Sequence, residues 1–267
     1  MKSDKNNGML TFGGHLEVLR RMIFRILGVA GITAIVVFCM KDQTWRILLA
    51  PSEWSFITYT WIENIIHDLG AGNFCFGKFH VDLIATDLSS QFMTHLTTSL
   101  YIGLLVASPY VLYELFRFVS PALFENERKY ATRVIVAVYF LFIVGILINY
   151  FILFPISFRF LGTYQVAEQV RSTITLDSYI STFISLTLLM GIVFQLPVLA
   201  FILGKMGIID FCLLSKYRKH AFLVIVTISA IITPGQDILT LTVVTLPLYF
   251  LYEVSLWIVK KVSNEKS

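Results

Sequence analysis

The side chains best suited to chemistry gather in one short polar stretch, residues 114–133. The second span ends at Glu114, and Glu125 and Glu127 follow in a loop with several basic residues, where the aromatic Phe118 flanks the rigid Pro121. Carboxylates can hold a guanidinium group through two parallel hydrogen bonds, and an aromatic ring can stack alongside it. The pattern therefore fits recognition of a cationic peptide. Acids at such a place can also complement the positive end of a helix dipole, so the residue types leave both interpretations open.

Motifs for catalysis are missing from the sequence. It contains neither H-E-x-x-H nor G-x-S-x-G, which excludes the common metalloprotease and serine-hydrolase signatures. The segment Gly72–Lys78 resembles a P-loop, but Phe79 stands where the motif requires serine or threonine. The three cysteines lie far apart, without metal-ligand spacing. We therefore expect a protein that is not an enzyme and that uses no metal and no cofactor.

Three polar residues interrupt otherwise apolar segments. His95 could serve in a proton relay, or it could form a hydrogen-bonded contact between helices. Asn149 and Gln195 could join neighbouring helices or border a polar cavity. The sequence alone decides none of these alternatives.

The segments that carry these residues are apolar enough for a membrane. Hydrophobic residues make up 57% of the 267 residues and charged residues only 14%, with a mean hydropathy of +0.76. A soluble domain carries about 25% charged residues, so a soluble globule, a disordered chain and a nucleic-acid-binding domain are excluded. We predict an all-α integral membrane protein, a single domain over residues 1–267. Its six transmembrane helices are expected at about residues 22–40, 92–113, 132–154, 179–203, 220–233 and 238–259.

The charges predict how the chain crosses the membrane. Of the 21 lysines and arginines, 16 fall in the N-terminal segment, in two alternate loops and in the C-terminal tail. Basic residues concentrate on the cytoplasmic side, so both termini should be cytoplasmic. The first outer loop holds three tryptophans, and we expect short amphipathic helices at the membrane interface between Thr44 and Asp68. The second outer loop, residues 155–177, is long enough for a helical cap.

Taken in order, short motifs along nearly the whole chain resemble the TatC family, the multi-spanning receptor of the twin-arginine protein translocase. They lie before the first span, in the first cytoplasmic loop, in the fourth span and before the sixth. The matching segments are His15-Leu16-Glu17-Val18-Leu19-Arg20-Arg21, Ser120-Pro121-Ala122-Leu123 with Glu127-Arg128, Phe194-Gln195-Leu196-Pro197-Val198, and Thr233-Pro234 to Asp237.

This resemblance implies a receptor of the inner membrane. The family binds the S-R-R-x-F-L-K signal peptides of folded cargo at the cytoplasmic face. It then works with small single-span subunits in the lipid bilayer, driven by the proton-motive force, and we expect an oligomer that binds no nucleic acid. By resemblance, the signal-peptide site comprises Glu127, Phe118, Arg20, Glu17, Pro121 and Arg128. Partner contacts and a polar cavity are expected at Gln195, Asp237 and Glu253, and an acid placed like Glu253 can also pair with a nearby base.

Two departures from the family pattern bear on the site. The N-terminal acid is Glu17, one residue earlier than in the family signature, and Val18 takes the expected place. One residue turns a helix by about 100°. The acid common in the fourth span is Gln195 here, which keeps hydrogen bonding but removes a charge. The alternative function is a secondary transporter of a small solute, for which Pro197 and Pro247 offer helix breaks but no internal repeat is visible.

Overall fold

The computed structural model describes residues 12–68, 81–123, 128–164, 173–233 and 237–264, and these are predominantly helical. The helices are α1 (Phe12–Cys39), α2 (Lys41–Leu49), α3 (Ile57–Asp68), α4 (Ser90–Leu123), α5 (Arg128–Ile148), α6 (Phe154–Thr163), α7 (Leu176–Val193), α8 (Leu196–Lys205), α9 (Phe211–Lys216), α10 (Arg218–Ile232) and α11 (Ile238–Asn264). A 3₁₀ turn covers Ala50–Ser52 and a π-helical turn covers Asn149–Leu153. The strands β1 (Leu83–Ile84) and β2 (Ile174–Thr175) pair in parallel.

Five helical segments of the described chain are long and apolar enough to cross a membrane. They are Leu16–Cys39, Ser90–Phe118, Val134–Thr163, Leu176–Lys205 and Thr240–Asn264. The predicted all-α membrane fold is confirmed. The remaining expected segment, 220–233, corresponds to α10, whose 15 residues are fewer than in the other five. That α10 crosses the membrane stays a prediction.

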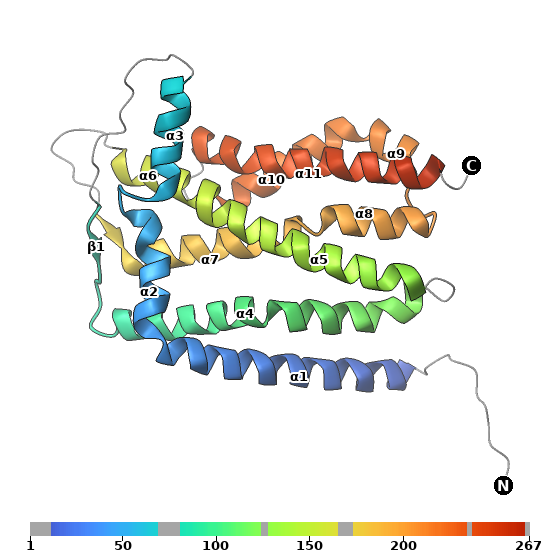
Figure 1. Ribbon diagram of the computed structural model, residues 1–267, viewed down its shortest axis with the longest axis horizontal. Helices are drawn as coiled ribbons and strands as arrows, with labels where there is room; N and C mark the ends of the chain where they lie inside the picture. Colours follow the sequence, from blue (N-terminus) through green and yellow to red (C-terminus); the bar gives the residue numbers. More distant parts are fainter. Residues whose placement is uncertain (1–11, 69–80, 124–127, 165–172, 234–236, 265–267) are drawn as a thin grey trace, which may run out of the picture.

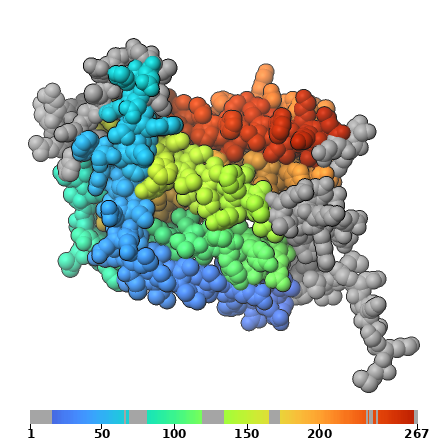
Figure 2. Space-filling model, viewed as in Figure 1, coloured from blue at the N-terminus to red at the C-terminus, as the bar shows by residue number. Residues whose placement is uncertain are grey.

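The long helices run side by side along the longest axis of the molecule (Figure 1). The helices α2, α3 and α6 and the strand β1 gather at one end, which we call the cap end. The start of α1, the end of α4, the start of α5 and the end of α11 lie at the opposite end, which we call the terminal end. Figure 2 shows α1 and α2 along one flank, α11 along the other and the surface of α5 between them.

Two helices extend further than hydropathy alone predicts. The second span was expected at residues 92–113, but α4 continues to Leu123 at the terminal end. The third span was expected to finish at 154, but the helix passes through the π turn into α6 and ends at Thr163. Pro155 does not stop it: the proline is the second residue of α6, directly after the π turn, and a local π adjustment of this kind lets a membrane helix tolerate a proline. Helical hydrogen bonding continues past the apolar segment, so hydropathy misplaces both ends.

The cap end is held by hydrogen bonds from buried tyrosines. The expected amphipathic helices are present as α2 and α3. The Tyr59 hydroxyl donates to the carbonyl oxygens of Pro51 (2.9 Å) and Pro155 (3.0 Å), and Tyr179 donates to Leu48 O (2.7 Å). Burial raises the pKa of the Tyr59 phenol, so Tyr59 remains a donor. These bonds fix the outer loop to α6 and α7.

The polar residues inside the apolar segments mostly join helices. His95 is buried, accepts a hydrogen bond from Trp45 Nε1 (3.0 Å), and places Nε2 3.3 Å from Phe38 O. Asn149 is fully buried and its Nδ2 donates to Thr187 Oγ1 (2.8 Å), which ties the π turn to α7. The structure therefore shows interhelical contacts for both residues.

The helices α1 and α4 approach each other closely. Thr33 Oγ1 donates to Gly103 O across the contact (2.8 Å). A Cβ atom added to Gly103 would lie 2.5 Å from the Ala34 backbone. Small residues allow this approach between membrane helices, and the same pair of helices encloses the pocket described next.

Candidate functional site

A polar pocket of about 240 Å³ lies between α1 and α4 at the terminal end. We call it the α1–α4 pocket. Its lining residues are Val18, Arg21, Met22 and Arg25 from α1, and Glu114, Arg117 and Phe118 from α4. On α1, Val18 and Met22 are four residues apart, as are Arg21 and Arg25, and on α4 the same spacing separates Glu114 from Phe118. Residues four positions apart lie on the same face of a helix. Among the described residues, the pocket therefore combines three arginine side chains, one carboxylate and one aromatic ring.

The carboxylate of Glu114 is the buried centre of this pocket. Glu114 is only 6% exposed. Arg25 Nη1 lies 3.6 Å from Glu114 Oε1, and the Tyr110 hydroxyl donates to the same oxygen (3.1 Å). A buried carboxylate needs a cation or hydrogen-bond donors to offset its lost hydration. Arg25 and Tyr110 supply both.

Glu17 lies one turn before Arg21 on α1, beside the α1–α4 pocket but not among the described residues that line it. It is exposed, accepts a hydrogen bond from Arg21 Nε (3.0 Å) and lies 3.8 Å from Arg20 Nη1. Because α1 is helical from Phe12, the one-residue shift places Glu17 about 100° around the helix from Val18, which lines the pocket.

The other residues predicted for signal binding come from α1, from the end of α4 and from the segment that follows it. Phe118 lines the α1–α4 pocket, as described above. Arg20 is exposed on α1, and its guanidinium lies 5.8 Å from the centre of the Phe24 ring. Pro121 belongs to the last turn of α4 and Arg128 is the first residue of α5, but their side chains fall outside what the structure describes. Glu127 lies outside the described residues altogether.

Gln195 lies at the break between α7 and α8. Its Nε2 donates to Val138 O (3.2 Å) and to Gly191 O (3.4 Å), so it joins α5 to the break. Its Oε1 is buried and has no hydrogen-bond partner among the described residues. The side-chain oxygen of Gln195 can therefore still accept a hydrogen bond.

Asp237 caps the start of α11 at the cap end. Its Oδ2 accepts a hydrogen bond from Thr240 N (2.7 Å), which satisfies an amide that the helix itself leaves unpaired. Asp237 also lines a cavity of about 720 Å³ with Phe160 and Leu161 of α6 and with Tyr164, which follows α6. Asp237 and Glu253 are 16 residues apart on one helix, or about 24 Å. The expected partner-contact residues thus occupy separate places.

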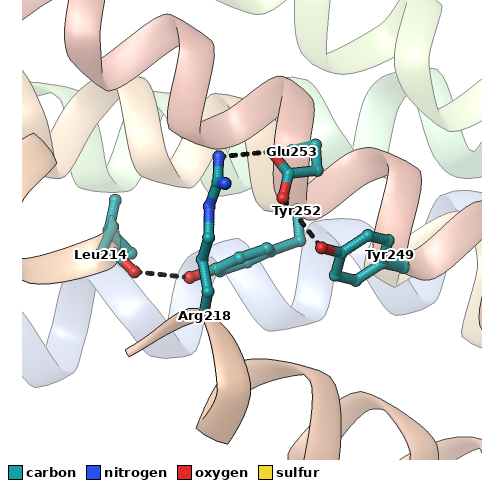
Figure 3. Close-up of polar contacts among 5 residues, drawn as sticks. All are labelled: Leu214, Arg218, Tyr249, Tyr252 and Glu253. Carbon is teal, nitrogen blue, oxygen red and sulfur yellow. Dashed lines mark hydrogen bonds and ion pairs between the residues drawn. The ribbon is translucent and has the colours of Figure 1, made fainter. Parts of the chain in front are cut away.

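Glu253 fastens α10 to α11 (Figure 3). Arg218 Nη2 lies 2.8 Å from Glu253 Oε2, and the Tyr249 hydroxyl donates to Glu253 Oε1 (3.0 Å). Tyr252 donates to Leu214 O (2.8 Å) and so holds α9 beside the pair. The sequence suggested that Glu253 could pair with a nearby basic residue, and Arg218 is that residue.

Replacing Arg218 by glutamine should reduce stability only slightly. The side chains of Arg218 and Glu253 are 47% and 33% exposed, and such ion pairs contribute at most about 1 kcal/mol. We expect a small fall in the melting temperature in detergent that disappears at high salt. Lys219→Gln, which removes the same charge from the neighbouring exposed position, is the control. A large loss that persists at high salt would contradict this weak, screened pairing.

Comparisons with known proteins agree with this architecture. The family model described as "Sec-independent protein translocase protein (TatC)" matches residues 14–247. The chain belongs to the TatC family. A TatC protein of Blattabacterium sp. subsp. Periplaneta americana is 35% identical, with all of both chains covered. One of Carboxydothermus hydrogenoformans is 33% identical over 94% of this chain and 93% of the relative.

Solved structures extend the TatC likeness to three dimensions. A crystal structure of the twin-arginine translocase receptor TatC superposes with a TM-score of 0.73, at 28% identity, and covers 93% of this chain and 99% of that chain. A second, in the detergent DDM, gives 0.74 at 27% identity and covers 92% and 99%. TatC proteins are translocase components rather than enzymes. The chain is therefore a membrane component of the Sec-independent translocase family.

Sequence reasoning missed part of this TatC pocket. It noted Glu114 but placed neither Glu114 nor Arg25 in the site, and it gave Arg117 no role. The i, i+4 spacing of Glu114 with Phe118, and of Arg21 with Arg25, was the available signal. No pattern within either segment of the sequence indicates that these faces of α1 and α4 pack against each other.

Proposed function

We propose that the chain is the receptor and core subunit of a twin-arginine translocase in the cell inner membrane. It binds the twin-arginine signal peptide of folded cargo at the cytoplasmic face. It then recruits small single-span subunits into an oligomer that exports the cargo with the proton-motive force. The α1–α4 pocket carries the proposal, because it joins an aromatic ring and a buried carboxylate at one end of the helices.

The charge distribution supports a cytoplasmic terminal end. Four arginines border or flank the α1–α4 pocket, and further basic residues lie on α9, α10 and the end of α11. Cytoplasmic segments are enriched in such residues. A signal peptide that reaches the membrane from the cytoplasm would therefore meet the pocket and the predicted Glu127 loop first.

The contacts with single-span subunits have weaker but distinct support. The buried Oε1 of Gln195 lacks a partner among the described residues, and Asp237 lines the cavity beside α6. A polar group in the bilayer is stabilised when a neighbouring helix supplies a donor. We propose that a partner helix uses the Gln195 acceptor, while Asp237 and Glu253 stay predictions as partner contacts.

Binding of a signal peptide to purified protein in detergent tests the receptor role. We expect a fluorescent peptide with S-R-R-x-F-L-K to bind more tightly than its Lys-Lys version, because lysine cannot form the two parallel bonds of a guanidinium group. Glu127→Gln should remove this preference. Equal, weak binding of both peptides to the wild-type protein would count against the proposal.

A further inference from the structure

We propose that Glu114 is a second carboxylate of the signal-peptide site and that Arg25 occupies it until a peptide arginine replaces it. The inference rests on the proposed function of the α1–α4 pocket. It adds an acid from α4 to a site whose expected acids were Glu17 and Glu127. It also explains how a pocket rich in arginine can admit a cationic ligand.

The charge of the pocket requires an exchange. Among the described residues, Arg21, Arg25 and Arg117 line it; Arg21 is paired with Glu17 at 3.0 Å, so Arg25 and Arg117 stand against the carboxylate of Glu114. A further guanidinium added beside Arg25 and Arg117 would be repelled by both of them, because like charges at short distance repel. If Arg25 swings out as the ligand enters, the charge inside the pocket is unchanged.

The pair between Arg25 and Glu114 is loose enough to be exchanged. The Arg25 side chain is 55% exposed, and its nitrogen lies 3.6 Å from the carboxylate oxygen. Strong charge-assisted bonds are about 2.7–2.9 Å long and often bidentate. Arg25 and Tyr110 both contact the carboxylate at Oε1. Moving the Arg25 guanidinium group from Glu114 into water therefore costs little free energy.

An arginine of the signal peptide can bind the Glu114 carboxylate more strongly than Arg25 does. The Tyr110 hydroxyl holds the Glu114 carboxylate from its own helix, four residues away, and remains in place during the exchange. Phe118 provides an aromatic face on the pocket wall, against which a guanidinium can stack. With Val18 where the family signature has its acid, Glu114 is the carboxylate that lines this pocket in the part of the chain that the structure describes.

Four variants and the same fluorescent peptide test the exchange. Glu114→Gln should weaken S-R-R-x-F-L-K binding by about tenfold or more, as expected for the loss of a charged hydrogen bond. Arg25→Gln should strengthen it by about three- to tenfold, because the acid then lacks its internal cation. In the double variant the gain should vanish. Arg117→Gln, which removes the same charge from the same pocket, is the matched control and should change binding much less than Arg25→Gln.

Thermal unfolding in detergent shows whether each variant is folded. Arg25→Gln should melt below the wild type, and the peptide should raise its melting temperature more than that of the wild type. Arg25→Lys keeps a cation without the planar fork, so its affinity should lie between those of the wild type and Arg25→Gln.

The outcomes separate this inference from the proposed function. A wild-type protein that does not prefer the Arg-Arg to the Lys-Lys peptide overturns both. If that preference is present, unchanged binding in Glu114→Gln overturns the exchange alone. So does an Arg25→Gln protein that binds no better than Arg117→Gln.

Discussion

Glu127→Gln should abolish export of twin-arginine cargo while the protein still inserts into the membrane. The change removes one charge and keeps the size and polarity of the side chain. Hydrogen bonds to charged groups contribute about 1.5–3 kcal/mol, which corresponds to a roughly ten- to hundredfold loss of affinity. The measurement is the appearance of a twin-arginine reporter outside the cytoplasm, normalised to the amount of membrane-inserted protein.

Glu125→Gln is the control for the export experiment. It makes the same change two residues away, at an acid that the family resemblance does not place in the signal-peptide site. Export should remain near the wild-type level in this variant. Undiminished export in Glu127→Gln would mean that Glu127 does not recognise the signal peptide.

Gly103→Ala should disrupt the packing of α1 against α4 and, with it, signal-peptide binding. The added methyl group would lie 2.5 Å from the Ala34 backbone, where no side-chain rotation can relieve the overlap. Overpacking of this kind costs about 1–3 kcal/mol. Separating the helices would also lengthen the bond from Thr33 to the Gly103 carbonyl and widen the α1–α4 pocket. The measurement is the melting temperature in detergent together with the affinity for the Arg-Arg peptide.

Gly31→Ala provides the matched comparison on α1. A Cβ atom at Gly31 would meet nothing within 4 Å, and alanine is the better helix former. We expect unchanged or slightly higher stability and unchanged peptide binding. Equal melting temperatures for Gly103→Ala and Gly31→Ala would show that the helices separate at little cost.

The sequence was sufficient for the membrane fold because hydropathy and helix length share a physical cause. A helix must bury about 20 apolar residues in hydrocarbon, and long apolar runs therefore reveal α1, α4, α5 and α7–α8. Hydropathy, however, indicates only where the chain is apolar. It could not show that α4 continues to Leu123, where Glu114 and Phe118 become part of a pocket.

The site was predicted less completely, because its geometry depends on two helices distant in sequence. Phe118 was found through a recognisable motif. The pairing of Arg25 with Glu114 joins residues 89 positions apart, and no periodicity on either helix encodes it. The displaced acid at Glu17 was visible in the sequence, but its pairing with Arg20 and Arg21 required the regular course of α1.

The shortness of α10 has a consequence for the surrounding lipid. Its 15 residues extend about 22 Å, whereas the hydrocarbon core is about 30 Å thick. The apolar side chains of Leu223, Val224, Ile228 and Ile231 are exposed along it. If α10 crosses the membrane as proposed, acyl chains beside it must compress or tilt to match this length. The bilayer would then be strained next to α10 and relaxed beside the much longer α1, so the protein would impose a gradient of membrane thickness around its own perimeter.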